Sequence, residues 1–163
     1  MPDMLVKLYD LPPIGEVERE MAEKNIVIRK PIGPENYYVM NWITEHFSRT
    51  WASEAENAFF NNPKTIYIAC REGNDGKNKM LGFACYDATV RGFFGHTGVA
   101  EDERSQGIGR ALLIYSLYGL RDLGYGYAII GSPGPIDFYK KSCGATVIEG
   151  SEPGVYKIGR AHV

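Results

Sequence analysis

Glycine and arginine residues stand at the predicted start of a long helix, where their types and spacing suit the binding of an anion. In the stretch GVAEDERSQGIGRALLIYSLYGL, which begins at Gly98, Gly107 and Gly109 lie between Arg104 and Arg110, and apolar residues at helical spacing follow. A helix start leaves four backbone N–H groups without intrahelical partners, and the helix dipole adds positive potential there. Glycine keeps side chains away from these groups and tolerates the backbone angles that turn them inward. The loop therefore favours phosphate, and a pyrophosphate would suit it.

Three phosphate-binding motifs compete for this loop. A P-loop requires a lysine after its second glycine, and no lysine stands in that place. The dinucleotide fingerprint requires Gly or Ala three positions after its second glycine, directly behind a strand. Leu112 stands there instead, and residues 100–105 separate the predicted strand from the loop. Both motifs are therefore disfavoured, whereas residues 104–109, RSQGIG, satisfy a third pattern, Arg/Gln-x-x-Gly-x-Gly/Ala.

The elements that must position this loop are predicted from periodicity and from turn residues. Strands are expected at 25–31, 64–72, 80–89, 92–100, 126–130, 144–150 and 154–159, and helices at 33–47, 51–62, 107–123 and 134–143. Ahead of them, we expect a short extra strand or an ordered arm at 4–9 and a charged helix at 14–24. This order predicts an α/β (α+β) layered domain around one mixed sheet.

The strand expected at 92–100 contains three glycines, Gly92, Gly95 and Gly98. Glycine inside a strand often marks a bulge, or the close approach of another backbone or of a ligand. A bulge at this point would splay the neighbouring strand and open a cleft beside the helix start. The alternative is that these glycines simply allow the sheet to curve.

Composition and charge limit the classes of function. The chain has 163 residues, 44% hydrophobic and 23% charged, which predicts one soluble domain over residues 1–163 with a sizeable core. A formal net charge of -2 argues against a nucleic-acid binder that neutralises phosphates. Cys70, Cys85 and Cys143 are odd in number and widely spaced, so we expect core thiols, with no disulfide framework and no metal site. Residues 1–25 lack a long apolar run, so we expect a cytoplasmic protein without a signal peptide or a membrane span.

Over roughly residues 26–149, the chain resembles the GCN5-related N-acetyltransferase (GNAT) family. TGVAEDERSQGIGRALL matches that family's acetyl-CoA segment, and DFYKKSCGA matches its later Phe-Tyr-x-x-x-Gly segment. The resemblance implies a mixed, mostly antiparallel central sheet that is splayed at an acetyl-CoA cleft and flanked by helices, with residues 1–25 as an N-terminal extension. It also implies acetyl-CoA as cosubstrate and an enzyme that moves the acetyl group to a primary amine by direct attack on the thioester.

The same resemblance implies which residues bind the coenzyme. Backbone groups of Gln106 to Arg110 would hold the pyrophosphate, and the main chain near Thr97 to Val99 would pair with the pantetheine arm like an added strand. The predicted coenzyme-binding residues are Thr97, Gly98, Val99, Arg104, Ser105, Gln106, Gly107, Ile108, Gly109 and Arg110.

Acetyl transfer to an amine sets three chemical requirements. The amine must be neutral, the developing oxyanion needs a donor such as a backbone N–H near Val99, and the departing thiolate needs a proton or a hydrogen bond. Tyr139, in the matched Phe-Tyr segment, is the candidate for the last role, because a phenol with a pKa near 10 keeps its proton at neutral pH. The alternative is a tyrosine that only packs. Asp87, His96, Glu101 and water all remain open as the general base.

By the same resemblance, the amine acceptor is expected on the side of the helix pair and its break, EHFSRTWASE. Trp42, His46, Phe47 and Trp51 could form an aromatic wall there or serve as core faces, and a core face is the preferred interpretation for Trp42. The nearby acidic residues could attract a cationic amine or form a solvated helix face; they are Glu45, Glu54 and Glu56.

The function predicted from these residues is an acetyl-CoA-dependent N-acetyltransferase whose partner is a small-molecule amine, such as an amino sugar. No nucleic-acid or membrane partner is expected, and a homodimer is allowed. One alternative is a non-catalytic acyl-CoA-binding module in which Tyr139 is structural, and another is a plain interaction domain without a ligand.

Overall fold

The strands of the protein form one mixed sheet. The computed structural model describes residues 1–158, and the strands in that range are β1 (Met4–Lys7), β2 (Ile26–Arg29), β3 (Ile66–Glu72), β4 (Asn78–Tyr86), β5 (Phe93–Val99), β6 (Tyr127–Ile130) and β7 (Thr146–Val147). They lie side by side in the order β2-β3-β4-β5-β6-β1-β7. β5 and β6 run parallel, and the other neighbouring pairs are antiparallel. The predicted mixed, mostly antiparallel sheet is confirmed.

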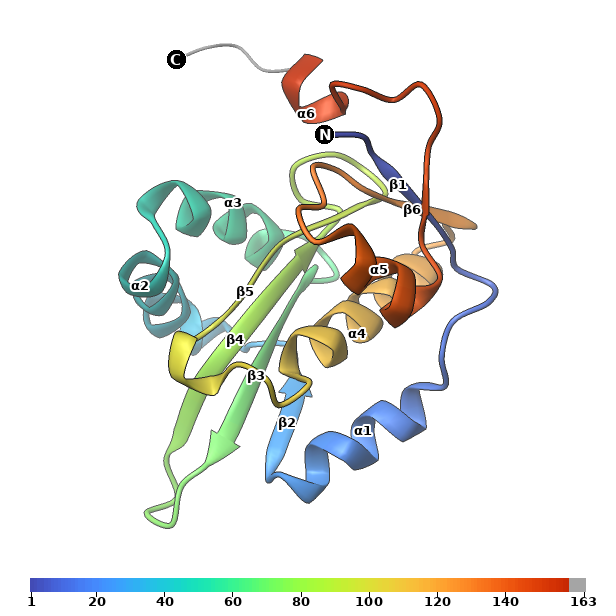
Figure 1. The fold of residues 1–163 in the computed structure, drawn as a ribbon. Helices are drawn as coiled ribbons and strands as arrows, with labels where there is room; N and C mark the ends of the chain where they lie inside the picture. The colour runs from blue at the N-terminus through green and yellow to red at the C-terminus, as the bar shows by residue number, and fades with distance from the viewer. Residues whose placement is uncertain (159–163) are drawn as a thin grey trace.

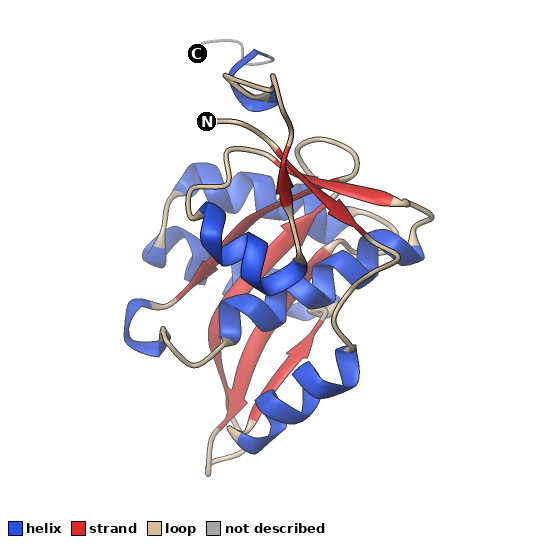
Figure 2. Ribbon diagram, turned by 45° about the vertical axis from the view of Figure 1, so that its right-hand side comes forward, coloured by secondary structure: helices blue, strands red, loops and turns tan. Residues whose placement is uncertain are grey.

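Helices cover both faces of this sheet (Figures 1 and 2). They are α1 (Ile14–Glu23), α2 (Asn36–His46), α3 (Arg49–Phe60), α4 (Ile108–Asp122), α5 (Ile136–Cys143) and α6 (Val155–Ile158), with 3₁₀ turns η1 (Gly33–Glu35) and η2 (Glu101–Glu103). α2 and α3 pack on one face, and α1, α4 and α5 lie on the other. Within residues 1–158, no helix combines the length and the apolar character that a bilayer crossing requires.

The central strands β3 and β4 are buried on both faces of the sheet, which explains their nearly continuous apolar sequence. Successive side chains of a strand point to opposite faces. Phe83 and Cys85 of β4 therefore pack toward α2 and α3, and Ala84 and Tyr86 pack toward α4. A Cβ at Gly119 of α4 would overlap the Tyr86 ring, so this glycine allows α4 to lie close to the middle of the sheet.

The strand β5 leaves its neighbour β6 after two residue pairs. Phe93 pairs with Ile129 and Phe94 with Ile130, and the ladder between the two strands then stops. On its other edge β5 stays paired with β4 as far as Val99, with a register shift between Ala84 and Tyr86. Two residues of β5, Gly95 and His96, thus face one residue of β4, which is the geometry of a bulge. The bulge predicted in this strand is confirmed, and Gly95 has a φ of +123° there.

The segment at residues 4–9, predicted as an extra strand or an arm, contains β1. This strand lies inside the sheet, between β6 and β7. Met4, Val6 and Leu8 are completely buried there. The N-terminal strand therefore belongs to the core.

The prediction of a strand at residues 154–159 is wrong. The described part of this segment contains the short helix α6, and its last residue lies outside the described range. A stretch this short fits either a helical or a strand period. Its backbone groups find other partners, because the N–H of Val155 donates to Asp3 Oδ2 at 3.0 Å and the N–H of Lys157 donates to the carbonyl of Gly154 at 3.2 Å.

Candidate functional site

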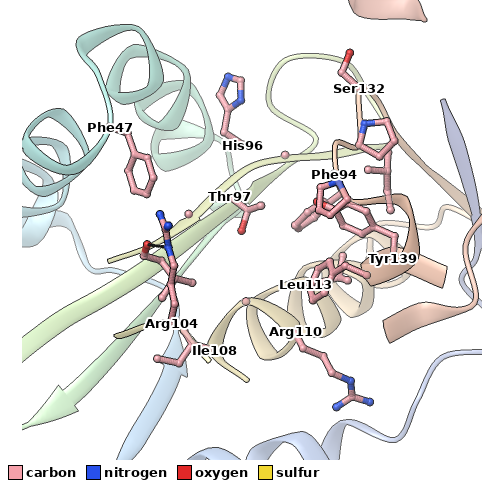
Figure 3. A pocket seen from close by; sticks show the side chains of 18 of the residues that line it. Phe47, Phe94, His96, Thr97, Arg104, Ile108, Arg110, Leu113, Ser132 and Tyr139 are labelled. Carbon is pink, nitrogen blue, oxygen red and sulfur yellow. Dashed lines mark hydrogen bonds between the residues drawn. The ribbon is translucent and has the colours of Figure 1, made fainter. Parts of the chain in front are cut away.

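A cavity of about 700 Å³ opens where β5 and β6 part. Its wall is built mainly from β5, the loop after η2, the first turns of α4, the loop after β6, and α5, with further residues from the break between α2 and α3, from α3 and from α6. In Figure 3, Arg104, Ile108 and Arg110 lie at one end, and His96 and Ser132 lie at the other. The cavity therefore connects the start of α4 with the point where the sheet parts.

The loop before α4 presents backbone donors to this cavity. Gly107, the N-cap of α4, has a φ of +83°, and Ser105 has a φ of +69°. These left-handed conformations turn the chain sharply at the helix start. The first backbone hydrogen bond of the helix runs from the N–H of Ala111 to the carbonyl of Gly107 at 3.0 Å. Within residues 1–158, the backbone N–H groups of residues 106–110 donate no hydrogen bond to the protein.

Basic side chains surround these donors. Arg104 is exposed, and its Nε donates to the carbonyl of Val99 at 3.3 Å. Arg110 is partly exposed and lies 3.9 Å from a carboxylate oxygen of Glu20, a long ion pair. The start of α4 thus combines open amides with two cations, which is an environment that stabilises a phosphate group.

A network behind the loop holds it in place. Arg71 Nη1 donates to both carboxylate oxygens of Glu103, at 2.6 and 2.9 Å, and this hydrogen bond lowers the pKa of Glu103. The side chain of Gln106 accepts from Arg71 Nη2 at 3.1 Å and donates to the Glu103 carbonyl at 3.1 Å. Lys24 of the turn after α1 donates to the Gln106 carbonyl. Gln106 therefore supports the loop from behind, and its side chain does not line the cavity.

The open edge of β5 forms the next part of the wall. The N–H of Ala100 donates to the carbonyl of Leu81 at 2.8 Å. Since backbone groups alternate between the two edges of a strand, the N–H and C=O groups of Thr97 and Val99 point away from β4, toward the cavity. Gly98 allows a close contact on one face of the strand, because a Cβ at this position would overlap the Phe47 ring. The edge can accept an extended chain as an added strand.

The predicted coenzyme-binding residues come together around the cavity. The lining includes Thr97, Gly98, Val99, Arg104, Ser105, Gly107, Ile108, Gly109 and Arg110, while Gln106 lies behind the loop. Their role in binding stays a prediction. The resemblance to the GNAT family indicated these residues, which belong to one continuous turn and the strand that leads into it.

Tyr139 lies on the side of the cavity, at the α5 wall (Figure 3). Its side chain is almost completely buried, and its ring contacts the rings of Phe94 and Phe138 with centroids 6.3 and 5.1 Å away. Burial raises the pKa of Tyr139 to about 12. The phenol thus keeps its proton well above neutral pH and remains a hydrogen-bond donor.

The three side chains that the sequence analysis named as candidates for the general base lie in different places. Asp87 has a φ of +53° and accepts from the N–H of Gly92 at 2.6 Å and from the Tyr125 hydroxyl at 2.8 Å, so it stabilises a turn outside the cavity. Glu101 is exposed in η2 and does not line the cavity. His96 does line it, in the bulge of β5, and its ring is stacked on Trp51 with centroids 4.8 Å apart.

The predicted aromatic wall is formed by two of its four members. Phe47 and Trp51 line the cavity and are stacked with centroids 4.9 Å apart. The Ser48 hydroxyl accepts from the N–H of Trp51 at 3.1 Å, and this cap starts α3 two residues earlier than predicted. Trp42 instead packs against the core beneath α2 and α3, and His46 stacks on it with centroids 4.0 Å apart.

The acidic residues of this region do not line the cavity. Glu54 accepts from the Thr89 hydroxyl at 2.6 Å, and Glu45 and Glu56 are exposed. Sequence reasoning missed several lining residues, namely Leu113, Ile130, Ser132, Pro133, Phe138 and Tyr156. Phe138 could have been found, since it belongs to the same Phe-Tyr segment as Tyr139. No local signal marked Tyr156, which was expected in a strand.

Several solved structures share this fold. The glucosamine N-acetyltransferase region of a fungal multi-domain GH3 β-N-acetylglucosaminidase is 14% identical, with a TM-score of 0.74 over 90% of this chain and 19% of that chain. A GCN5-related N-acetyltransferase from Sphaerobacter thermophilus is 20% identical, with a TM-score of 0.67 over 90% of this chain and 48% of that chain. A GNAT-family acetyltransferase from Colwellia psychrerythraea is 14% identical, with a TM-score of 0.60 over 90% of this chain and 52% of that chain.

This chain spans from about a fifth to about half of the length of those chains, and at such identities the likeness shows the fold. No functionally curated protein matches the sequence. The model of the acetyltransferase (GNAT) family matches residues 36–145, a range that includes the loop before α4 as well as α5. Because this match covers more than half of the 163 residues, the chain belongs to the GNAT acetyltransferase family.

Proposed function

We propose that this protein is an acetyl-CoA-dependent N-acetyltransferase that acts on the primary amine of a small molecule. The observation that carries the proposal is the row of backbone N–H groups at residues 106–110, which have no partner in residues 1–158. Residues 107–110 of this row line one end of the cavity. Unpaired donors at a helix start favour an anion there. The open edge of β5 leads from them to the point where the sheet parts.

The residues present fit acetyl-CoA in two respects. The amides at the start of α4, together with Arg104 and Arg110, would hold the pyrophosphate. The N–H and C=O groups of Thr97 and Val99 would pair with the amide groups of the pantetheine arm, as a neighbouring strand does. When bound, acetyl-CoA supplies an acyl group activated as a thioester.

The proposed reaction transfers the acetyl group directly to nitrogen. A neutral amine attacks the thioester carbonyl carbon, an N–C bond forms, and the C–S bond breaks to give an amide and a thiol. A backbone N–H near Val99 would donate to the carbonyl oxygen as negative charge develops on it. Tyr139 would donate a proton or a hydrogen bond to the departing sulfur, since its pKa of about 12 keeps it protonated.

We propose that His96 accepts the proton that the amine releases. Of the side chains considered as bases, His96 is the one that lines the cavity, whereas Asp87 is held in a turn and Glu101 is exposed to solvent. An imidazole changes its protonation near neutral pH, which suits a proton acceptor. Stacking on Trp51 of α3 holds its ring in one orientation.

An amino sugar is the acceptor class that we put first. Phe47 and Trp51 line the cavity with apolar aromatic side chains, and pockets that combine apolar walls with a few polar groups suit small ligands. One protein with the same fold is described as a glucosamine N-acetyltransferase region. That likeness motivates the choice of glucosamine as the first amine to test.

The test is an amine panel that contains glucosamine, a polyamine, an arylalkylamine and an amino acid, with release of free thiol from acetyl-CoA as the readout. We expect turnover with at least one amine. Replacing Tyr139 with Phe should lower that turnover at least about tenfold, since general acid–base catalysis typically contributes roughly 10²- to 10⁴-fold, while calorimetry shows unchanged coenzyme binding.

Tyr118→Phe is the matched control, because the Tyr118 hydroxyl donates to the carbonyl of Pro12 at 2.9 Å, away from the cavity. Its turnover should equal that of the wild type. Unchanged turnover in Tyr139→Phe would remove the acid role. Coenzyme binding without turnover of any amine would favour the non-catalytic acyl-CoA-binding module, and absence of coenzyme binding would end the proposal.

A further inference from the structure

The two ends of the described chain are joined at Asp3. The N–H of Asp3 donates to the Ser151 hydroxyl at 2.8 Å, its carbonyl accepts from the N–H of Ile148 at 2.9 Å, and its Oδ2 accepts from the N–H of Val155 at 3.0 Å. Figure 1 shows α6 next to the N-terminus, above β1 and β6. Asp3 thus bonds to the segment at 148–155 through both its main chain and its carboxylate.

The carboxylate of Asp3 is unusually placed for a charged group. Asp3 is 3% exposed, and its Oδ1 has no hydrogen-bond partner within residues 1–158. Gly154 fits closely beside it, because a Cβ there would lie 3.0 Å from Oδ1, and its φ is +95°. Burial of a carboxylate costs free energy unless the group is hydrogen-bonded. The hydrogen bond from the N–H of Val155 offsets part of this cost, and it fixes the residue at which α6 begins.

Tyr156 follows directly in α6 and lines the cavity. Its ring lies against Gly131, where a Cβ would come within 2.5 Å of a ring carbon, and its centroid is 5.5 Å from that of Phe93. Gly131 is the residue after β6 and precedes Ser132, which lies at the end of the cavity opposite the loop of Arg104 and Ile108 (Figure 3). Tyr156 therefore lines the cavity near the end that lies away from the predicted pyrophosphate site.

We propose that Tyr156 is a specificity-determining residue for the amine acceptor and that Asp3, through α6, is its positioning residue. The inference rests on the proposed function, because the acceptor occupies this end of the cavity only if the coenzyme occupies the other. The acceptor would be an amine with a ring or an apolar part that packs on the Tyr156 ring. Residues at the two ends of the described chain would thus set which amine is accepted.

The first experiment measures the positioning role without any substrate. Hydrogen–deuterium exchange is followed at 131–134 and 151–158 in the full chain and its variants. Asp3→Ala should speed exchange in both segments, whereas Asp3→Asn should stay near the wild type, because the amide oxygen still accepts from Val155. Glu152→Gln is the matched control, since it breaks an exposed ion pair between the Glu152 carboxylate and the N-terminal amine in the same segment.

The second experiment measures specificity with the best amine of the panel. Tyr156→Ala should raise the KM for that amine about tenfold, as expected for loss of one aromatic contact, with coenzyme affinity unchanged. Tyr156→Phe should retain the wild-type KM, because the ring stays. Asp3→Ala should also raise the KM for the amine, whereas Asp3→Asn should retain the wild-type KM.

The two experiments test the specificity role of Tyr156 and the positioning role of Asp3 separately. An unchanged amine KM in Tyr156→Ala overturns the specificity role, even where the wild type transfers acetyl groups. Unchanged exchange in Asp3→Ala overturns the positioning role. A wild type that binds coenzyme A but acetylates no amine removes the specificity role together with the proposed function, while the exchange experiment still decides whether Asp3 holds Tyr156.

Discussion

Tyr139 and Cys143 lie one turn apart on α5, and both side chains are withdrawn from water. Burial raises the pKa of Tyr139 from about 10 to about 12 and that of Cys143 from about 9 to about 11. Both groups are therefore neutral in the folded protein at physiological pH. The same burial that keeps the phenol protonated for a donor role also makes this helix sensitive to alkali.

The folded protein should lose stability as alkali removes these protons. A pKa that is raised by folding means that the folded state binds the proton more tightly, so the contribution is complete below the unfolded value and is lost as pH rises through the folded value. For Tyr139 this window runs from about pH 10 to about pH 12, and a two-unit shift corresponds to roughly 2 to 3 kcal/mol. Urea unfolding at several pH values should show a shallower alkaline loss in Tyr139→Phe than in the wild type. Identical slopes would contradict the burial of this phenol.

At the scale of an element, α4 is bounded by glycines in the left-handed region. Gly107 precedes it with a φ of +83°, and Gly124 follows it with a φ of +102°. Both positions strain a residue that carries a Cβ. Gly107 faces the cavity, and Gly124 lies away from it. Substitutions at these two glycines therefore distinguish the effect of backbone strain from an effect on ligand binding.

Alanine at either glycine should destabilise the protein by about 1 to 2 kcal/mol, the cost of a left-handed conformation. Gly107→Ala should also weaken coenzyme A binding about tenfold, because the loop amides no longer keep their orientation. Gly124→Ala should bind coenzyme A as the wild type does. Calorimetry and urea unfolding measure the two effects, and equal coenzyme affinities in both variants would argue against the loop as the pyrophosphate site.

Across the whole molecule, β1 links parts of the sheet that few other contacts hold together. β6 pairs with β5 at two positions, whereas it pairs with β1 along four. β1 also carries β7 on its other edge. The half of the sheet that contains β6 therefore depends on the N-terminal strand.

Deletion of residues 1–8 should prevent stable folding. It removes Met4, Val6 and Leu8, all fully buried, and each large buried side chain contributes about 2 to 5 kcal/mol, against a total stability of roughly 5 to 15 kcal/mol for a typical protein. Circular dichroism and size-exclusion chromatography should show an unfolded or aggregated chain. Lys7→Ala, at an exposed position of β1, should fold normally. A cooperative thermal transition in the truncated chain would show that the rest of the sheet folds without β1.

Local patterns were sufficient for the features that depend on neighbours in sequence. Gly107 and Gly109 with the apolar run behind them predicted the start of α4, because capping and helical period are properties of a few adjacent residues. The glycines of β5 indicated a bulge or a curved sheet, and the structure shows a bulge at Gly95 and His96. The mixed sheet followed from the order of helices and strands, and the resemblance supplied its splayed, mostly antiparallel form.

Contacts between distant residues decided the rest. Whether Val155 begins a strand or a helix depended on Asp3, which lies at the other end of the described chain. The aromatic residues near the helix break all pack against the core, but only Phe47 and Trp51 among Trp42, Phe47 and Trp51 also line the cavity. That difference depended on how α2 and α3 pack on β4 and β5. The order of residues thus determined which segments form helices, strands and an anion-binding turn, since hydrogen bonding within a few residues sets these. Tertiary packing decided which side chains share the cavity, because their positions depend on burial between distant segments, which local periodicity does not report.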